Sequence, residues 1–195
     1  MKRDESSIKG EKLIEGLKLF IPTVYNDLRG KFYESFRISD FNRDNFEVIQ
    51  ENTSVSMKNV MRGLHWQSGV NAQAKLVTVL QGAVIDFVLD LRKDSETFGM
   101  MNFVYLDEYE CKQFFIPAGF AHGFLSLADN TKFQYKVDIA YNKESERGVN
   151  LFSPKLHLIE SLNKFFTFEE PIAKDAIILS DKDAIFPDFN KSTKF

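Results

Sequence analysis

The stretch KLVTVLQGAVIDFVLDLR, residues 75–92, holds two apolar runs of strand length on either side of Gln81 and Gly82. Valine and isoleucine are frequent in both runs, and their branched side chains favour strands over helices. A glycine between two such runs predicts a tight turn, so we expect the runs to be antiparallel strands paired through it. The stretch therefore indicates an all-β protein.

The same pattern continues toward the C-terminus. The runs FGMMNFVYL, KQFFIPAGFAHGFLSL and TKFQYKVDIAY follow at strand spacing, with Gly, Pro, Asp and Asn between them. Successive strands without intervening helical patterns favour an antiparallel sandwich or barrel. Helical patterns lie at the margins, over residues 39–46 with Ser39 as a cap and over residues 153–166. We expect a flexible segment over residues 1–12 and one domain over residues 13–190.

Composition narrows the function. The 195 residues are 44% hydrophobic and include 20 phenylalanines, enough for a sizeable aromatic core. The net charge is −3, and the interspersed charges form no basic stripe, which argues against a nucleic-acid partner. The only cysteine, Cys111, excludes an internal disulfide and a cysteine-based zinc cluster. Because no run approaches the roughly 18 apolar residues of a membrane span, we expect a soluble cytoplasmic protein with no membrane partner.

One motif resembles a known superfamily. The run IPAGFAHGF, residues 116–124, contains Pro-x-Gly-x-x-His, which resembles the second motif of the cupin jelly rolls. In metal-binding cupins the first motif supplies a His-x-His pair and a glutamate, because a divalent metal needs several converging ligands. Here the matching run RGLHWQ offers only His65, with Trp66 beside it. The resemblance therefore implies a cupin-type jelly roll with a few short peripheral helices and no metal.

The run RGLHWQ also indicates a polar pocket. His65 stands between Leu64 and Trp66, two residues that favour burial. Arg62 lies three residues earlier, and a buried guanidinium needs an anion or a carboxylate as partner. This pair predicts an anionic ligand or a catalytic pocket. For His122, a structural role in the core and a role in the pocket both remain open.

A longer series of motifs resembles one enzyme family. From Leu13 to Pro187 the chain is similar to the nucleotide-sugar 3,5-epimerases that act on dTDP-4-dehydro-6-deoxy-D-glucose in rhamnose synthesis. The similarity rests on an ordered set of short segments, which are DLRGKFYESF, QENTSVS, RGLHWQ, QAKLV, PAGFAHGF, FQYK, YNKESERG and LSDKD.

The resemblance implies four catalytic residues. Inversion of a carbon next to a ketone requires a base, a group that stabilises the enolate oxyanion and an acid on the opposite face. His65 matches the base and Asp183 the residue that orients it. Lys75 matches the oxyanion stabiliser, and Tyr135 the acid, since a phenol with a pKa of about 10 is protonated at neutral pH. No cofactor is expected, because the 4-keto group of the substrate acidifies both neighbouring carbons.

The resemblance also implies substrate-binding residues and a homodimer. Arg62 and Arg29 match diphosphate ligands, for which the planar guanidinium is suited. The other matched positions face the nucleotide or the sugar and include a thymine-stacking tyrosine at Tyr141; they are Glu34, Gln50, Asn52, His122, Glu146 and Lys182. In family members Arg29 and Glu34 reach the site of a neighbouring subunit. The alternatives are packing for Tyr141, on the strand face of Tyr135, and an exposed pair of Glu146 with Arg147.

Several positions depart from the family pattern, and other functions stay open. Trp66, Thr53 and Thr78 replace the commoner tyrosine, histidine and arginine, and residues 150–175 form a longer segment of unknown role. The alternatives are an epimerase of C3 or C5 alone, an enzyme for a GDP-linked or other 4-keto nucleotide sugar, a cupin-like ketoisomerase and a non-catalytic sugar-binding jelly roll. The sequence does not identify the accepted sugar, the inverted carbons or the polysaccharide that is served, such as a lipopolysaccharide.

Overall fold

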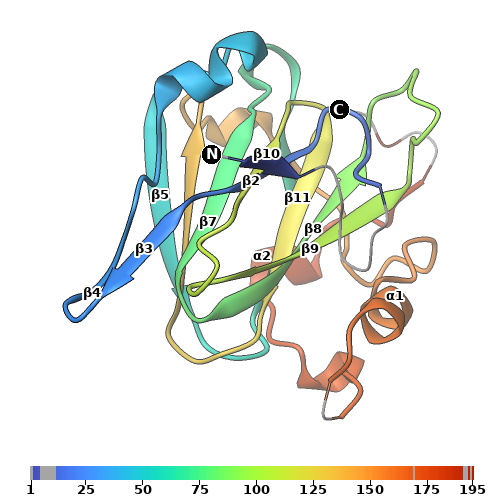
Figure 1. Ribbon diagram of the computed structural model, residues 1–195. Coiled ribbons are helices and arrows are strands. Elements are labelled where there is room, and N and C mark those ends of the chain that lie inside the picture. The colour runs from blue at the N-terminus through green and yellow to red at the C-terminus, as the bar shows by residue number, and fades with distance from the viewer. Residues whose placement is uncertain (1, 5–11, 169, 191–192, 194) are drawn as a thin grey trace.

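The computed structural model describes residues 2–4, 12–168, 170–190, 193 and 195, and Figure 1 shows two β-sheets packed face to face. One sheet has the strand order β1-β2-β10-β7-β12-β5 and the other β13-β6-β11-β8-β9; β3 and β4 form a separate hairpin. Neighbouring strands in the two sheets and in the hairpin are antiparallel. This arrangement confirms the all-β sandwich that the strand pattern predicts.

The element bounds are as follows. The strands are β1 (Lys2–Asp4), β2 (Lys18–Ile21), β3 (Val24–Asp27), β4 (Gly30–Tyr33), β5 (Gln50–Ser56), β6 (Met61–Gln67), β7 (Lys75–Gln81), β8 (Ala83–Asp90), β9 (Met101–Asp107), β10 (Gln113–Ile116), β11 (Phe120–Ser126), β12 (Thr131–Val137) and β13 (Glu146–Gly148). In the described part of the chain the α-helices are α1 (Leu158–Phe165) and α2 (Asp181–Ala184), and 3-10 helices cover Ile38–Asp44, Gly69–Asn71, Lys143–Ser145 and Lys174–Ala176.

The turn at Gly82 is present, but the predicted pairing across it is wrong. β7 pairs with β10 and β12, whereas β8 pairs with β9 and β11 in the other sheet. The chain therefore passes from one sheet to the other at Gly82, which has a φ of 80°. A Cβ at this position would lie 2.5 Å from Oγ1 of Thr131, so both the conformation and the space require glycine.

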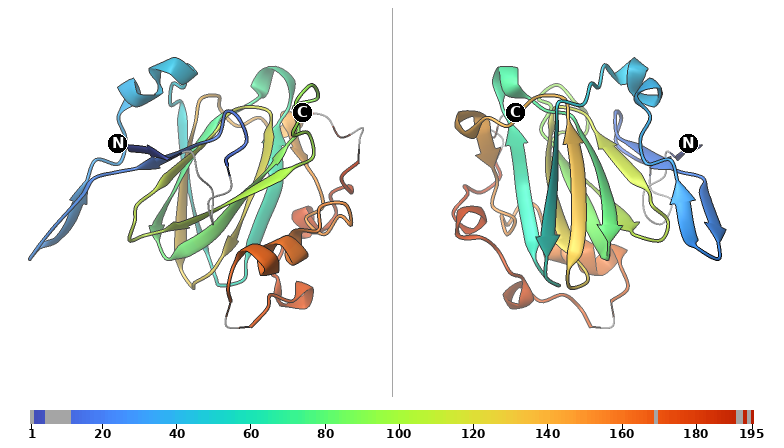
Figure 2. Two further views of the ribbon diagram at one scale, coloured as in Figure 1. Left: turned by 45° about the vertical axis from the view of Figure 1, so that its right-hand side comes forward. Right: turned by 90° about the vertical axis from the view of Figure 1, so that its left-hand side faces the viewer.

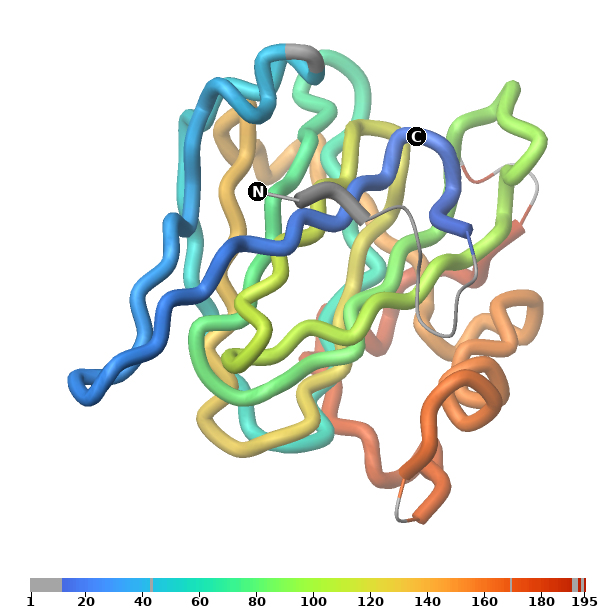
Figure 3. The backbone as a smooth tube through the Cα atoms, viewed as in Figure 1, coloured from blue at the N-terminus to red at the C-terminus, as the bar shows by residue number. Residues whose placement is uncertain are grey.

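β8 is buried on both faces, which explains its continuous apolar sequence. Val84 and Val88 belong to the core between the two sheets. Ile85, Phe87 and Leu89 belong to a second core on the outer face of their sheet. Leu158 and Leu162 of α1 cover that outer face, so the C-terminal segment that contains α1 lies against the five-stranded sheet (Figure 3). On the inner face of β8, the buried carboxylate of Asp86 alternates with the two valines.

The marginal helices are shorter than predicted. Residues 38–44 form a 3-10 helix whose N-cap is Arg37, so the prediction of Ser39 as the cap is wrong. Within residues 153–166, only Leu158–Phe165 is α-helical. Phe41, from the 3-10 helix, packs with Phe20, Phe46 and Phe115 in a third core on the outer face of the six-stranded sheet.

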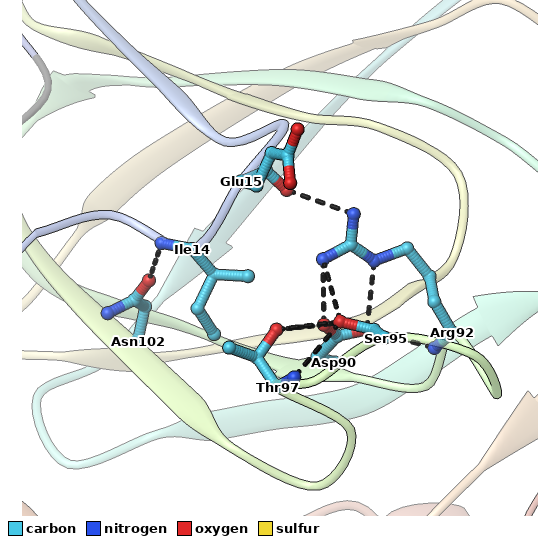
Figure 4. A network of polar contacts seen from close by, with 7 residues as sticks. All are labelled: Ile14, Glu15, Asp90, Arg92, Ser95, Thr97 and Asn102. Atoms are coloured by element: carbon cyan, nitrogen blue, oxygen red, sulfur yellow. Dashed lines mark hydrogen bonds and ion pairs between the residues drawn. The ribbon is translucent and has the colours of Figure 1, made fainter.

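A polar network around the buried Asp90 attaches the beginning of the domain to the loop after β8 (Figure 4). Asp90 accepts hydrogen bonds from Arg92, at 2.7 Å and 3.0 Å, and from Ser95 and Thr97, at 2.8 Å and 2.6 Å. Nη1 of Arg92 donates to the backbone oxygen of Glu15 at 3.0 Å. The network fixes the chain just before β2, the strand that leads into the β3–β4 hairpin.

The structure describes part of the N-terminal segment that the sequence predicts to be flexible. Leu13, Ile14 and Leu17 are buried in the inner core, and Lys2–Asp4 pair with β2 as an antiparallel strand. The rest of the predicted flexible segment, residues 1 and 5–11, lies outside the described residues, so its flexibility stays a prediction.

The β3–β4 hairpin projects beyond the two sheets, as both views of Figure 2 show. Among the described residues, no helix is long and apolar enough to cross a membrane.

Candidate functional site

A cavity of about 290 Å³ lies between the two sheets. Its lining combines charged, aromatic and small side chains from both sheets and from α2, namely Ser54, Arg62, Gly63, His65, Lys75, His122, Gly123, Phe124, Phe133, Tyr135, Glu146, Ser180, Lys182 and Asp183. All four predicted catalytic residues are among them. A concave site with a few convergent polar groups is typical of small-molecule binding.

A β-bulge brings both Arg62 and His65 to the cavity. His65 lies opposite His122 and Arg62 lies opposite Phe124, so Gly63 and Leu64 of β6 face the single residue Gly123 of β11. The extra residue reverses the alternation of side chains within β6. Leu64 consequently packs in the outer core, as do Met61 and Trp66, while the arginine and the histidine face inward. The expectation that His65 enters the pocket between two buried neighbours is confirmed.

Gly63 allows the two strands to approach at the bulge. Its φ is 107°, and a Cβ there would lie 2.5 Å from the backbone oxygen of His122. Gly123 on the facing strand has a similar constraint, because its Cβ would lie 2.6 Å from the backbone oxygen of Arg62. No other residue type fits at either position without a backbone shift. The glycines in RGLHWQ and PAGFAHGF thus have a physical role in shaping the cavity floor.

His65 and Asp183 form a hydrogen-bonded pair. Nε2 of the histidine lies 2.5 Å from Oδ1 of the aspartate. Ser180 caps α2, since its Oγ accepts from the backbone nitrogen of Asp183 at 3.2 Å, and this fixes the position of the carboxylate. Burial raises the pKa of Asp183, but the bond to His65 and that ring's charge outweigh burial and leave it below the ordinary value. With Nε2–H donating to a carboxylate, the lone pair is on Nδ1.

Lys75 lies in a buried electrostatic group with Asp86 and His122. Burial lowers the pKa of Lys75 to about 8, and the negative charges of Asp86 and Glu146 oppose that decrease. Oδ2 of Asp86 lies 2.8 Å from Nε2 of His122, and its Oδ1 is buried with no hydrogen-bond partner. Burial lowers the pKa of His122 and raises the pKa of Asp86. The buried carboxylate of Asp86 thus acts electrostatically on Lys75, which lines the cavity.

Tyr135 faces the cavity from the sheet opposite to His65. It belongs to β12 of the six-stranded sheet, whereas His65 belongs to β6 of the five-stranded one. Burial raises the pKa of Tyr135, and the charge of Glu146 raises it further, so the phenol is protonated at neutral pH. A neutral proton donor and an imidazole with a free nitrogen therefore line one cavity from its two walls.

A second polar group forms the rim. Glu146 accepts hydrogen bonds from Lys182 at 2.6 Å and from the hydroxyl of Tyr141 at 3.0 Å. The backbone nitrogen of Tyr141 donates to Gln50 at 2.9 Å, and Gln50 donates to Asn52 at 2.8 Å. Burial raises the pKa of Glu146, but its bonds to Lys182 and Tyr141 leave it below the ordinary value. The structure thus brings these five predicted residues together, although Gln50, Asn52 and Tyr141 do not line the cavity itself.

The rim settles two structural alternatives. Tyr141 follows the end of β12 and is half exposed, so it is not on the strand face of Tyr135. The carboxylate of Glu146 bonds Lys182, whereas Arg147 donates to backbone oxygens of Glu144 and Glu146. Neither plain packing of Tyr141 nor an exposed side-chain pair of Glu146 with Arg147 is present.

Arg29 and Glu34 lie apart from the cavity. Arg29, on the turn of the β3–β4 hairpin, is 90% exposed at its side chain and forms an ion pair with Asp27. Glu34 follows β4 and forms an ion pair with Arg37 at 2.5 Å. The hairpin projects from the two sheets, so these two predicted residues do not reach the site of their own chain (Figure 2).

Two features of the site were not predicted from the sequence. Asp86 lies in an apolar run, and its polar partner His122 is on another strand. Ser56 supports Arg62, whose Nε donates to its Oγ at 3.2 Å. Alternation along β8 and β5 places both side chains on inner faces, which is the signal that could have identified them. Within the described part of the chain, no three His, Cys, Asp or Glu side chains are grouped to hold a metal ion.

Known proteins are similar to this chain in sequence and in fold. A family model described as dTDP-4-dehydrorhamnose 3,5-epimerase matches residues 11–191. The dTDP-4-dehydrorhamnose 3,5-epimerase of Methanothermobacter thermautotrophicus is 37% identical over 172 residues, which cover 87% of this chain and 88% of that protein.

Two solved structures agree with these matches. The dTDP-4-dehydrorhamnose 3,5-epimerase of Elizabethkingia anophelis is similar with a TM-score of 0.80 and 38% identity, covering 97% of this chain and 96% of that one. The dTDP-6-deoxy-D-glucose-3,5-epimerase of Legionella pneumophila, solved in complex with dTDP-4-keto-L-rhamnose, has a TM-score of 0.78 and 34% identity, covering 97% and 100%.

Proposed function

Because this chain belongs to the dTDP-4-dehydrorhamnose 3,5-epimerase family, we propose that its cavity binds a dTDP-linked 4-keto-6-deoxy sugar and inverts C3 and C5. The protein is an isomerase, an epimerase of the dTDP-L-rhamnose pathway, and it has a cupin-like β fold. The Legionella pneumophila relative, whose structure contains a 4-keto sugar nucleotide, supports this substrate class.

The residues of the cavity provide a complete proton path. Nδ1 of His65 removes the proton from the carbon next to the ketone, and the C–H electron pair forms the enolate while the carbonyl electrons move onto O4. The ammonium of Lys75 stabilises the negative O4. The hydroxyl of Tyr135 then delivers a proton to the opposite face of the same carbon. Solvent restores the proton to the tyrosine and removes the one on the histidine, so atoms and charge balance after each inversion.

One observation carries this mechanism. His65 and Tyr135 line a single cavity from opposite sheets, and Lys75 lines the same cavity from β7, the strand next to that of Tyr135. Inversion, unlike simple proton exchange, needs a base and an acid on the two faces of one carbon. A ketoisomerase would need proton transfer on one face only, and a sugar-binding protein would need none of the three residues.

The rim residues, together with Arg62 and His122 of the cavity, are proposed to bind the rest of the substrate. Arg62, which faces the cavity, is suited to a diphosphate oxygen pair. Tyr141, half exposed and fixed by Glu146, offers a ring for the thymine. Gln50, Asn52, His122, Glu146 and Lys182 would contact nucleotide and sugar hydroxyls. The cavity is small, so the sugar would enter it while the nucleotide lies along the rim.

We further propose a homodimer in which the β3–β4 hairpin completes the neighbouring site. The hairpin exposes Tyr25, Leu28 and Phe32, apolar side chains that a partner surface would cover. Arg29 on its tip would then reach the substrate diphosphate of the other subunit, with Glu34 at the base of the same arm. A cytoplasmic location and a single domain over residues 13–190 are also our proposals, supported by the free buried Cys111 and by cores shared across the chain.

The function is tested with the substrate itself. Purified protein is incubated with dTDP-4-dehydro-6-deoxy-D-glucose, and the sugar product is identified by NMR before and after reduction of the ketone. Inverted C3 and C5 in the wild type, and neither in His65→Asn, is the expected result. Inversion of C3 or C5 alone would identify a single-centre epimerase instead. No conversion of this substrate, but conversion of a GDP-linked 4-keto sugar, would contradict the proposed nucleotide.

A further inference from the structure

The ring of Phe186 occupies the space beside His65 that a cross-strand side chain would normally fill. Gly148 of β13 lies directly opposite His65 of β6. Side chains of opposed residues project from the same face, with Cβ atoms about 5 Å apart. A Cβ at Gly148 would lie 2.5 Å from Cε2 of Phe186 and 2.6 Å from its Cδ2 and Cζ. Because the ring covers this position, a side chain at residue 148 would clash with it, and glycine leaves the space that the ring fills.

The same ring contacts the imidazole. The ring centroids of His65 and Phe186 are 5.4 Å apart, and their planes are inclined by 63°, an edge-to-face arrangement. Phe186 does not line the cavity and is half-buried. Its position next to the imidazole is thus a contact with the base and not with the space that the sugar would occupy.

Phe186 and Asp183 reach His65 from one short segment that is fixed at both ends. On one side, Ser180 caps α2 and so fixes the backbone of Asp183. On the other side, the backbone nitrogen of Asn150 donates to the oxygen of Pro187 at 2.9 Å, directly after Phe186. The carboxylate and the aromatic ring therefore approach the imidazole as one unit.

We propose that Phe186, in the space left by Gly148, is a positioning residue that fixes the plane of the His65 ring. This inference rests on the proposed function, in which His65 is the base. The single hydrogen bond to Asp183 holds Nε2, but a contact at one atom does not by itself fix the tilt of the ring plane. Proton abstraction needs the in-plane lone pair of Nδ1 directed at the C–H bond, and small misplacements of a reacting group are costly.

The test combines two single variants and their double variant. Phe186→Leu removes the ring, and Gly148→Ala places a methyl group where the ring lies. We expect each to lower kcat by about 10- to 100-fold, with KM within about twofold of the wild type. Because both variants disturb one contact, the double variant should lose much less than the product of the two single losses. Solvent deuterium exchange into the substrate should fall in the same proportion as kcat, since the base itself is misplaced.

Readouts other than activity separate positioning from folding. The nitrogen chemical shifts of the His65 side chain should still report a proton on Nε2 in Phe186→Leu, because Asp183 is unchanged. Phe98→Leu is the matched control. Phe98 packs on Phe189, a neighbour of Phe186 in sequence, and does not line the cavity. The kcat of this variant should therefore stay at the wild-type value. If Phe186→Leu fails to fold, Phe186→Met keeps the volume without the ring and carries the same expectation.

Two results would overturn this inference, and both differ from failure of the proposed function. Wild-type kcat in soluble Phe186→Leu, beside an inactive His65→Asn, would show that the ring does not position the base. Fully multiplicative losses in the double variant would show that Gly148 and Phe186 act separately. In contrast, a wild-type protein that fails to turn over the sugar, or an active His65→Asn, would refute the proposed function itself.

Discussion

Nε2 of His65 lies 2.5 Å from Oδ1 of Asp183, a residue 118 positions later in the chain. The contact joins a strand of the five-stranded sheet to the short helix α2. It assigns the free lone pair of the ring to Nδ1, the atom that would remove the substrate proton. It also places a negative charge where a protonated imidazole needs one.

Asp183→Asn should therefore impair chemistry more than binding. The amide keeps the shape of the side chain but removes the charge that stabilises the protonated ring, and it can favour the wrong tautomer. We expect kcat to fall by a factor on the order of 10²–10⁴ while the Kd for dTDP stays within about twofold. Steady-state kinetics and calorimetric titration with dTDP measure the two quantities. A variant with full activity would show that the aspartate has no part in catalysis.

The pH profile should depend on Lys75 and Asp86. The oxyanion requires the charged lysine, whose pKa is about 8, so kcat/KM should decrease as the pH rises through that value. The raised pKa of Tyr135 excludes the phenol as the source of this decrease. Asp86→Asn removes a charge that raises the pKa of Lys75, so the decrease should begin at lower pH.

Asp107→Asn is the control for the pH profile. Asp107 is a buried carboxylate of β9 that accepts backbone hydrogen bonds and does not line the cavity. Its substitution should leave the alkaline limb in place. An unchanged limb in Asp86→Asn would contradict the electrostatic link between Asp86 and Lys75.

Hybrid dimers test the proposed role of Arg29. Arg29→Ala and His65→Asn should each be weakly active alone, because one lacks the diphosphate ligand and the other the base. If Arg29 acts in the partner's site, every mixed dimer regains one site with both residues intact. Random mixing should then restore about a quarter of the wild-type activity. No recovery in a mixture shown to exchange subunits would place Arg29 outside the neighbouring site.

Activity should survive chelation. The first cupin motif lacks paired histidines, and both His65 and His122 use Nε2 in bonds to carboxylates. Exhaustive treatment with EDTA should leave kcat unchanged. Loss of turnover that one divalent ion restores would contradict a metal-independent mechanism.

Local sequence patterns predicted the strands but not all of their partners. The run RGLHWQ correctly indicated a polar pocket at His65 beside the buried Leu64 and Trp66. The inward direction of Arg62 depends on a bulge, which exists only relative to the facing strand. The turn at Gly82 was recognised, yet a local pattern does not distinguish a hairpin within one sheet from a passage between two sheets.

The site was predicted through motifs, and the supporting residues were not. The family resemblance predicted that Asp183 orients His65, although most of the chain separates the two residues. Their spacing in the sequence does not by itself predict this contact. Asp86 lies in an apolar run, and Phe186 resembles any core aromatic residue. Their roles follow from contacts with His122 and Gly148, residues distant in sequence.

The most direct test of the mechanism is deuterium incorporation by His65→Asn and Tyr135→Phe in D2O, followed by proton NMR of the sugar. Without the base, neither exchange nor product should form, and the rate should fall by a factor on the order of 10²–10⁴ or more. Without the acid, the enolate still forms and His65 returns a deuteron to the face it came from, so exchange should continue while inverted product falls sharply. Exchange at the wild-type rate in His65→Asn would contradict the assignment of the base.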